Sequence, residues 1–264
     1  MDQIHETEYY CNKGHHYLEE GLFKRALINF REALNTVGEN PREVLPLLLN
    51  MVQVYYLLGN YEMCENTLVK AMSMSERICR NNPSIDDKRT LSVIYNFLSA
   101  IYEVTWRDQL AIQLYTQDFQ IAKDIVDRRG NREDLYDLAV SYNNLAGVCI
   151  NAFLMVRHQV SKEPLAYYEK SIKILKQLDD TDERIKHALA VNYEKIGAVY
   201  EMLKEDADVY YKQALSCRLA CNKQDLVSIN HLLKVLHQEP VEGVDEWQIE
   251  RMMGEKRAGG LYKL

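Results

Sequence analysis

Histidine and cysteine side chains are the first candidates for chemistry, because their lone pairs and pKa values suit metal binding and nucleophilic catalysis. His15 and His16 form the only adjacent histidine pair, and no H-E-x-x-H zinc motif includes them. Cys217 and Cys221 are four residues apart, which places both thiols on one helix face. Zinc sites normally take four ligands from recognisable pairs, and the 6 cysteines form no C-x-x-C pair. We therefore expect no metal site and assign these thiols to packing.

Other constellations that carry chemistry are missing from the sequence. The acidic run at residues 179–183 lacks the register of a calcium loop, and carboxylates around Thr181 are typical of a helix N-terminus. Neither G-x-G-x-x-G nor G-x-x-x-x-G-K-[ST] occurs, so the sequence does not indicate nucleotide binding. No Ser, Cys and His set stands out as a nucleophile with its base. We expect a protein that is not an enzyme and binds no cofactor.

Composition narrows the partners and the compartment. The 32 basic and 39 acidic residues give a net charge of −7 without a basic stripe, which argues against nucleic acid as a partner. The N-terminus has no positive region followed by an apolar segment, so we expect no signal peptide. The longest apolar stretch, residues 44–59, contains Pro46, Asn50 and Gln53 and falls short of the roughly 20 residues that span a bilayer. We expect a soluble, cytoplasmic protein that does not enter membranes.

Five repeats of one pattern organise the chain. A large residue is followed after three positions by a medium one, then immediately by a small one, and after three more by Tyr or Cys. The instances are Tyr10/Lys13/Gly14/Tyr17, Leu48/Met51/Val52/Tyr55, Tyr95/Leu98/Ser99/Tyr102, Tyr142/Leu145/Ala146/Cys149 and Tyr193/Ile196/Gly197/Tyr200. A second pattern follows each of them, in the form Ala26/Phe30/Ala33, Cys64/Leu68/Ala71, Ala111/Tyr115/Asp118, Pro164/Tyr168/Ser171 and Ala207/Tyr211/Ala214. Repetition of this kind predicts a stack of helical hairpins.

The spacing within each pattern is that of one face of an α-helix, so each unit predicts two helices that pack together. Small residues such as Gly14, Ala26 and Gly197 stand where the two helices would cross, because a large side chain there would push the backbones apart. Turn residues agree with this reading. Gly59 and Asn60 suit the end of one helix and the start of the next, and Asn40-Pro41 suits a gap between units.

These patterns resemble the tetratricopeptide repeat (TPR), whose pattern is W-x2-L-G-x2-Y…A-x3-F…P. The resemblance covers about residues 7–215, and residues 137–147 are similar to the first helix of the long variety found in kinesin-light-chain-like and bacterial cytosolic members. No unit has the Trp, and the closing Pro is displaced or missing. The resemblance implies an all-α, right-handed superhelical solenoid of about five hairpins plus a C-terminal capping helix pair.

The units differ in length in an informative way. We expect the solenoid at 1–221, a degenerate sixth pair that caps it at 222–258 and a flexible tail at 259–264, with hairpins at about 7–40, 45–80, 92–128, 139–178 and 190–221. The small residues at 14, 52, 99, 146 and 197 are 38, 47, 47 and 51 residues apart, so the helices should exceed those of the standard repeat of ~34 residues. The fourth hairpin has about six extra residues at its tip. They predict either a longer first helix that packs on its neighbours or an exposed apolar lip of Phe153, Leu154, Met155 and Arg157.

The resemblance implies that ligands bind the concave side, which the first helix of each hairpin lines. Residues at offsets of one, two, five, eight and nine from the start of each first pattern share that side. They predict a binding set of Asn12, Asn50, Gln53, Tyr56, Asn96, Glu103, Asn143, Asn144, Glu194 and Glu201. An Asn amide can both donate to and accept from a peptide backbone, and the same Asn residues could instead brace neighbouring first helices. No Arg is expected to face the carboxylates, so the set favours a basic or neutral protein or peptide.

Three functions remain open at this point. The leading hypothesis is a non-catalytic scaffold or adaptor that binds a protein segment. The first alternative is a sensor whose superhelical curvature changes when a peptide binds, as the resemblance to bacterial peptide-responsive regulators implies. The second is a structural subunit of an oligomeric assembly.

Overall fold

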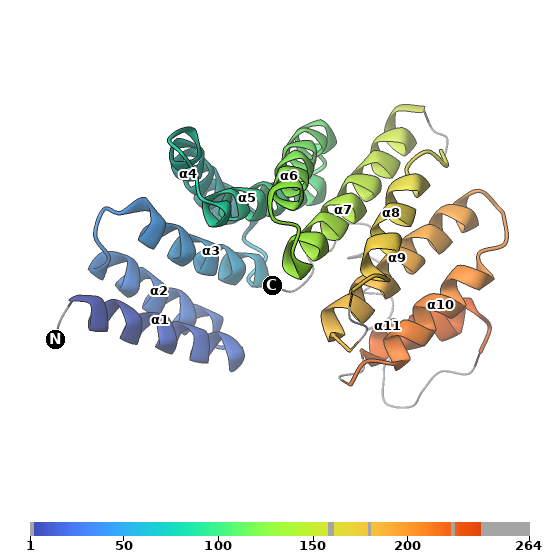
Figure 1. The fold of residues 1–264 in the computed structure, drawn as a ribbon. Coiled ribbons are helices and arrows are strands. Elements are labelled where there is room, and N and C mark those ends of the chain that lie inside the picture. The colour runs from blue at the N-terminus through green and yellow to red at the C-terminus, as the bar shows by residue number, and fades with distance from the viewer. Residues whose placement is uncertain (1–2, 158–160, 179–180, 223–224, 239–264) are drawn as a thin grey trace. The chain divides into compact units, whose positions relative to one another are not determined.

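The computed structural model describes residues 3–157, 161–178, 181–222 and 225–238, but not the side chains of residues 3, 4 and 152–157. In these residues the secondary structure consists of eleven α-helices (Figure 1). They are α1 (Gln3–Glu19), α2 (Phe23–Thr36), α3 (Pro41–Leu57), α4 (Tyr61–Arg80), α5 (Ile85–Val104), α6 (Asp108–Arg128), α7 (Arg132–Arg157), α8 (Leu165–Leu175), α9 (Glu183–Met202), α10 (Asp208–Leu219) and α11 (Leu226–Val235). The expected all-α architecture is confirmed.

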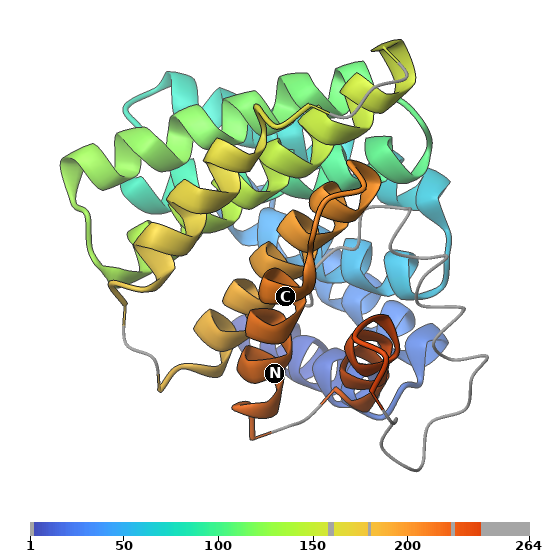
Figure 2. The ribbon, with the colours of Figure 1, turned by 90° about the vertical axis from the view of Figure 1, so that its right-hand side faces the viewer.

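Consecutive helices pack as hairpins, among them α1–α2, α3–α4, α7–α8 and α9–α10. Figure 2 shows α9 and α10 running alongside each other. The chain divides into two compact units, residues 1–101 and 102–264, and α5 crosses the boundary between them. The expected hairpins are therefore present, and their first helices are the odd-numbered ones from α1 to α9.

Side-chain caps start the helices where the sequence predicts. The Asn40 side chain accepts a hydrogen bond from the Arg42 N–H at 3.2 Å, and Pro41 occupies the first turn of α3. The Asn60 side chain accepts from the Met63 N–H at 3.1 Å and so caps α4. Asp182 caps α9 by accepting from the Arg184 N–H at 2.9 Å, which confirms that the acidic run at 179–183 leads into a helix N-terminus. These caps satisfy N–H groups that have no partner within the helix.

Five helices end in the same left-handed turn. The residue with positive φ is Gly21, Gly59, Trp106, Lys204 or His237. In each case the next N–H donates to a carbonyl five residues earlier, as Arg107 does to Tyr102 at 2.8 Å. Four of these residues stand eleven positions after the large residue that opens the repeat pattern of their helix, and His237 stands eleven positions after Leu226, the first residue of α11. The end of α11 therefore matches the ends of four first helices. The second helix of the pair expected at 222–258, around Trp247, and the tail expected at 259–264 lie outside the described residues.

Small residues lie where the helices of a hairpin cross, as expected. A Cβ added to Gly14 would stand 2.5 Å from a Phe30 ring carbon, and one added to Gly197 would stand 2.8 Å from a Tyr211 ring carbon. Both distances are shorter than van der Waals contact. Since Phe30 is completely buried, its ring cannot move aside easily. Glycine at these crossings thus permits an approach that even alanine would prevent.

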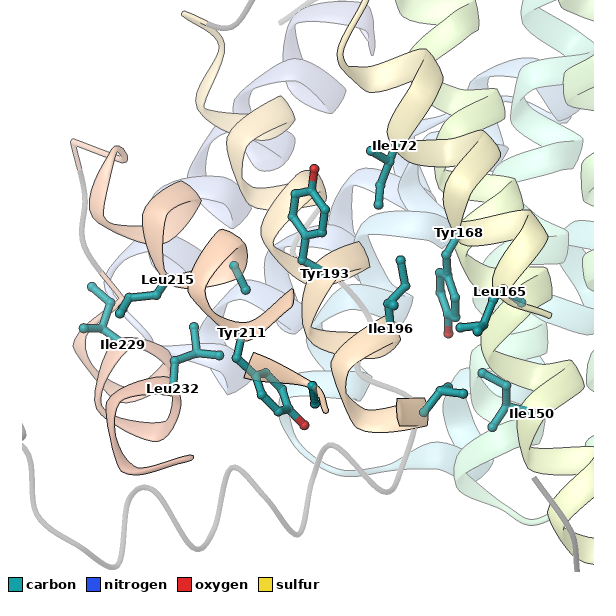
Figure 3. Close-up of a cluster of buried hydrophobic side chains, with 14 residues drawn as sticks. Ile150, Leu165, Tyr168, Ile172, Tyr193, Ile196, Tyr211, Leu215, Ile229 and Leu232 are labelled. Atoms are coloured by element: carbon teal, nitrogen blue, oxygen red, sulfur yellow. The ribbon is translucent and has the colours of Figure 1, made fainter. Parts of the chain in front are cut away.

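Apolar side chains fill the space within and between hairpins. In residues 102–264 a cluster joins α7 to α11 and includes Tyr168, Ile196, Tyr211 and Ile229 (Figure 3). In residues 1–101 the fully buried side chains include Phe30, Val54 and Leu68. Burial of this kind is the main favourable term for a repeat fold, in which each hairpin packs on its neighbours.

Arginine–carboxylate pairs hold the turns between hairpins, which we call inter-hairpin turns. Arg42 at the start of α3 donates to both oxygens of buried Asp87 in α5 at 2.8 and 2.9 Å. Arg129 does the same to buried Asp134 at 2.8 and 2.7 Å. Bidentate pairs of this kind fix orientation as well as distance. The inter-hairpin turns are consequently charged and closely tied.

Candidate functional site

The predicted binding set begins on α1 and α3 in the first unit. Asn12 is exposed on α1, while Gln53 and Tyr56 on α3 are half-buried. The Asn50 Nδ2 lies 3.3 Å from Nε2 of His15 and 3.9 Å from Sγ of Cys11. Asn50 therefore connects two neighbouring first helices, which is the bracing role that the sequence left open. Asn96 on α5 is half-buried.

The Glu103 carboxylate is the best-connected member of the set in the second unit, because two side chains donate hydrogen bonds to it. The Asn151 Nδ2 donates to one Glu103 oxygen at 3.1 Å, and the Tyr115 hydroxyl donates to the other at 2.9 Å. Burial raises the pKa of Glu103, whereas the hydrogen bond from Tyr115 and the positive charge of Lys195 act in the opposite direction. The negative charge of Glu103 is thus only partly compensated by its surroundings. A cation or a further donor beside it would be favourable.

The two asparagines of α7 differ in exposure. Asn143 is 7% exposed, and its buried Nδ2 has no hydrogen-bond partner. Such an atom costs about 1–3 kcal/mol when it stays unpaired. Asn144 is half-buried and retains access to solvent. A ligand can therefore reach Asn144 directly, but it can reach the Nδ2 of Asn143 only after that side chain rotates.

Glu194 and Glu201 on α9 have different surroundings. The Arg218 Nε and Nη2 both lie against Oε1 of Glu194, at 3.0 and 2.9 Å, and both side chains are buried. The expectation that no Arg faces the carboxylates is therefore wrong for Glu194. Glu201 is exposed and accepts from the Tyr211 hydroxyl at 2.7 Å. Of these two residues, only Glu201 offers an accessible carboxylate to a partner.

The extra residues of the fourth hairpin lengthen its first helix. α7 has 26 residues and continues to Arg157, against 20 for α5 and for α9. The side chains of the expected lip, Phe153, Leu154, Met155 and Arg157, lie outside the described part of the chain. The longer helix is confirmed, and the contact role of the lip stays a prediction.

The thiols and the possible metal ligands were the candidates for chemistry in the sequence. Burial raises the pKa of all six thiols, to about 12 for Cys64, so the reactive thiolate is disfavoured. In the same residues no group of three or more His, Cys, Asp or Glu could hold a metal ion. His15 and His16 are exposed, and His16 lies 3.3 Å from Glu20. A search for spans of membrane length and hydropathy found none among the described helices.

Two features escaped sequence reasoning. Arg218 is far from Glu194 in the chain, and only the helix packing brings them together. Trp106 takes the left-handed position that Gly21 and Gly59 take elsewhere, and its side chain is 69% exposed. The offset of eleven residues after Tyr95 was the signal that could have found this turn.

The comparisons with known proteins agree on the fold. No family model and no curated protein sequence matches the chain. A Rap protein complexed with competence and sporulation factor superposes with a TM-score of 0.63 at 14% identity, over 97% of this chain and 66% of that one. A kinesin-light-chain-type protein from Podosopora anserina with nearly identical TPR-like repeats gives 0.59 at 13% identity, over 82% and 97%. BtubC from P. vanneervenii gives 0.53 at 15%, over 98% and 91%.

These likenesses show that the chain has the fold of a tetratricopeptide-repeat solenoid, as the sequence predicts. The chain spans just under two thirds of the length of the Rap protein. At such low identities the fold is shared, and function has to be argued from the chain's own residues.

Proposed function

We propose that the chain is a non-catalytic scaffold that binds a protein segment on its first-helix face, the side formed by the predicted binding set. The fold supports this, because repeat solenoids present extended surfaces made from successive first helices. The observation that carries the proposal is the Glu103–Asn151 contact of 3.1 Å, in which polar groups of two successive first helices meet. Polar groups that meet on successive first helices can bind an extended backbone at more than one point.

The chemistry of the face favours a basic or neutral segment. Glu103 is only partly compensated by the donors around it, and Glu201 is exposed. A Lys or Arg side chain of the ligand would be attracted by these carboxylates, while an acidic tail would be repelled. The accessible amides of Asn12 and Asn144 would bind the ligand's backbone without reading its side chains.

The test compares two triple variants of the full chain. Asn12, Gln53 and Asn144 are changed to Ala in the first, and the exposed amides Asn66, Gln117 and Gln120 on second helices are changed to Ala in the second. Affinity purification from the native host, read by quantitative mass spectrometry, should show at least about tenfold lower recovery of specific partners with the first variant only. Equal recovery by both variants would contradict a role for the first-helix face.

A second candidate, a peptide-responsive regulator, is supported by the likeness to the Rap protein, whose structure contains competence and sporulation factor. Under this proposal a bound peptide would change the curvature of the solenoid. Small-angle scattering of the chain with a peptide identified by the purification would show a changed radius of gyration. An unchanged scattering profile at saturating peptide would exclude the regulator hypothesis and leave the scaffold hypothesis.

A further inference from the structure

Exposed apolar side chains gather at the hairpin tips, the turns that join the two helices of one hairpin. Twelve large apolar side chains are exposed in the described residues, and eight of them lie at a tip or within one turn of it. In the first unit they are Leu22, Leu57, Leu58 and Tyr61, and in the second unit Trp106, Leu110, Met202 and Val209. The inter-hairpin turns, by contrast, are held by the arginine–carboxylate pairs. The tips thus form the edge of each unit that retains uncovered apolar surface.

Trp106 is the most exposed of these residues, at 69%, and its backbone position disfavours it. Its φ is +61°, a region in which a bulky side chain is less stable than glycine. The corresponding turns contain Gly21 and Gly59, so the turn itself does not require an indole. No ring or cation lies against the Trp106 indole among the described residues. The side chain therefore contributes little to the fold that glycine would not.

The charges around the tips of the second unit identify the class of partner. Glu103 and Asp108 flank Trp106 in the sequence, and the guanidinium of Arg107 packs on the Tyr102 ring at 4.4 Å. At the tip of the fifth hairpin, Lys162 pairs with Glu205 at 2.6 Å and Lys212 pairs with Asp208 at 3.1 Å. Glu201 and Asp206 beside Met202 have no ion-pair partner in the described part of the chain. Apolar side chains bordered by carboxylates are complementary to a segment that carries both apolar and basic residues.

We propose that the tip of the third hairpin, which carries Trp106 and Leu110, forms a second docking surface, which binds a basic amphipathic protein segment with a Lys or Arg against the Trp106 indole. Tryptophan is the best aromatic partner for a cation, and Leu110 adds aliphatic contact one turn away. The carboxylates favour this occupant over an anionic membrane, which they would repel. Trp106 and Leu110 do not belong to the predicted binding set of the first-helix face, although Glu103, three residues before Trp106, does belong to it.

Intrinsic fluorescence tests the surface directly. The chain has two tryptophans, so a full-length Trp247→Phe protein reports on Trp106 alone. The probe is a short synthetic amphipathic peptide of Lys and Leu, and its counterpart has Glu in place of Lys. The Lys peptide should shift the Trp106 emission to the blue with saturation, and the Glu peptide should not. Equal shifts with both peptides would show non-specific apolar association and overturn the proposal.

Trp106→Gly separates docking from folding, since Gly is the residue of the corresponding turns. With a labelled Lys peptide, W106G should bind at least about tenfold more weakly at an unchanged circular dichroism spectrum. The matched control is Leu219→Ser, because Leu219 is 48% exposed at the end of α10, on an inter-hairpin turn of the same unit. This control and the first-helix triple variant should stay within about twofold of the wild type. Unchanged affinity in W106G would refute the surface.

Lipid vesicles test the alternative that Trp106 binds a membrane surface. Phosphatidylcholine vesicles, with and without added phosphatidylserine, should leave the Trp106 emission unchanged. A blue shift with vesicles and none with the Lys peptide would assign the tips to a lipid surface and overturn the protein partner.

Discussion

Arg218 and Glu194 form an ion pair whose Nη2 and Oε1 atoms are 2.9 Å apart, with side chains only 5% and 10% exposed. Arg218 also donates from Nη1 to the Nδ1 of His187 at 3.0 Å, which requires a neutral imidazole. The same guanidinium lies 3.6 Å from Asp225, the residue that caps α11. One arginine of α10 thus connects α9 with the start of α11.

Removal of Arg218 should destabilise the fold, because it leaves the buried Glu194 carboxylate without its positively charged partner. We expect Arg218→Met to lower the free energy of unfolding by about 3 kcal/mol in chemical denaturation. The double variant with Glu194→Met removes both charges and should return to within about 1 kcal/mol of the wild type. Arg80→Met is the control, because Arg80 is 72% exposed in its pair with Glu76 and should matter by less than about 0.5 kcal/mol. Equal losses in the single and double variants would show that packing, and not charge, explains the effect.

The glycine at the crossing of the fifth hairpin provides the second prediction. Gly197→Ala would normally favour a helix by about 1 kcal/mol. Here the new Cβ would stand 2.8 Å from the buried Tyr211 ring, so we expect a net loss of about 1–3 kcal/mol. Gly147→Ala in α7 is the matched control, because Gly147 is also helical and its added Cβ would stand 3.4 Å from the Tyr168 hydroxyl, an ordinary contact. If thermal unfolding showed G197A at or above the wild type, the helices would be further apart than described.

The fold was predictable because its determinants are local. Helical spacing, small crossing residues and caps such as Asn60 and Asp182 each depend on a few neighbouring residues, and the structure confirms them. Local propensity does not predict the left-handed Trp106, because it favours Gly at that position, and only the offset of eleven residues from Tyr95 indicates the turn.

The candidate site was predicted less well because its contacts are not local. The helical offsets predict Glu194 on the first-helix face. They cannot reveal that Arg218, 24 residues later, neutralises it. Asn50 shows the same limit, since its partner His15 is 35 residues away on another helix. Offsets identify a helix face, but only packing decides which of its side chains remain available to a ligand.

Acid should weaken the second unit through Asp182. Hydrogen bonds from the Arg184 side chain and backbone and from Arg132 lower the pKa of Asp182 to about 2 from its ordinary 3.8. Because the pKa of Asp182 is lower in the folded state, its charge stabilises the fold above about pH 4. This contribution is lost as the pH falls toward 2. Asp182→Asn keeps a capping side chain but loses the charge, and since solvent screens the pair we expect a loss of about 1 kcal/mol at pH 7. Denaturation curves at several pH values should converge for the two proteins near pH 2; a constant difference would contradict the assignment.

The Trp106 turn provides a prediction about stability that is independent of any partner. Trp106→Gly relieves a left-handed backbone that disfavours a bulky residue by about 1–2 kcal/mol, while glycine makes the unfolded chain more flexible by about 0.5–1 kcal/mol. The net expectation is a gain of about 0.5 kcal/mol, measured as a higher denaturation midpoint at an unchanged slope. Lys204→Gly is the companion variant, since Lys204 has a φ of +59° at the tip of the fifth hairpin, and it should behave alike. A loss of more than about 1 kcal/mol in W106G alone would mean that the indole stabilises the fold, and the reason for assigning it to a partner would disappear.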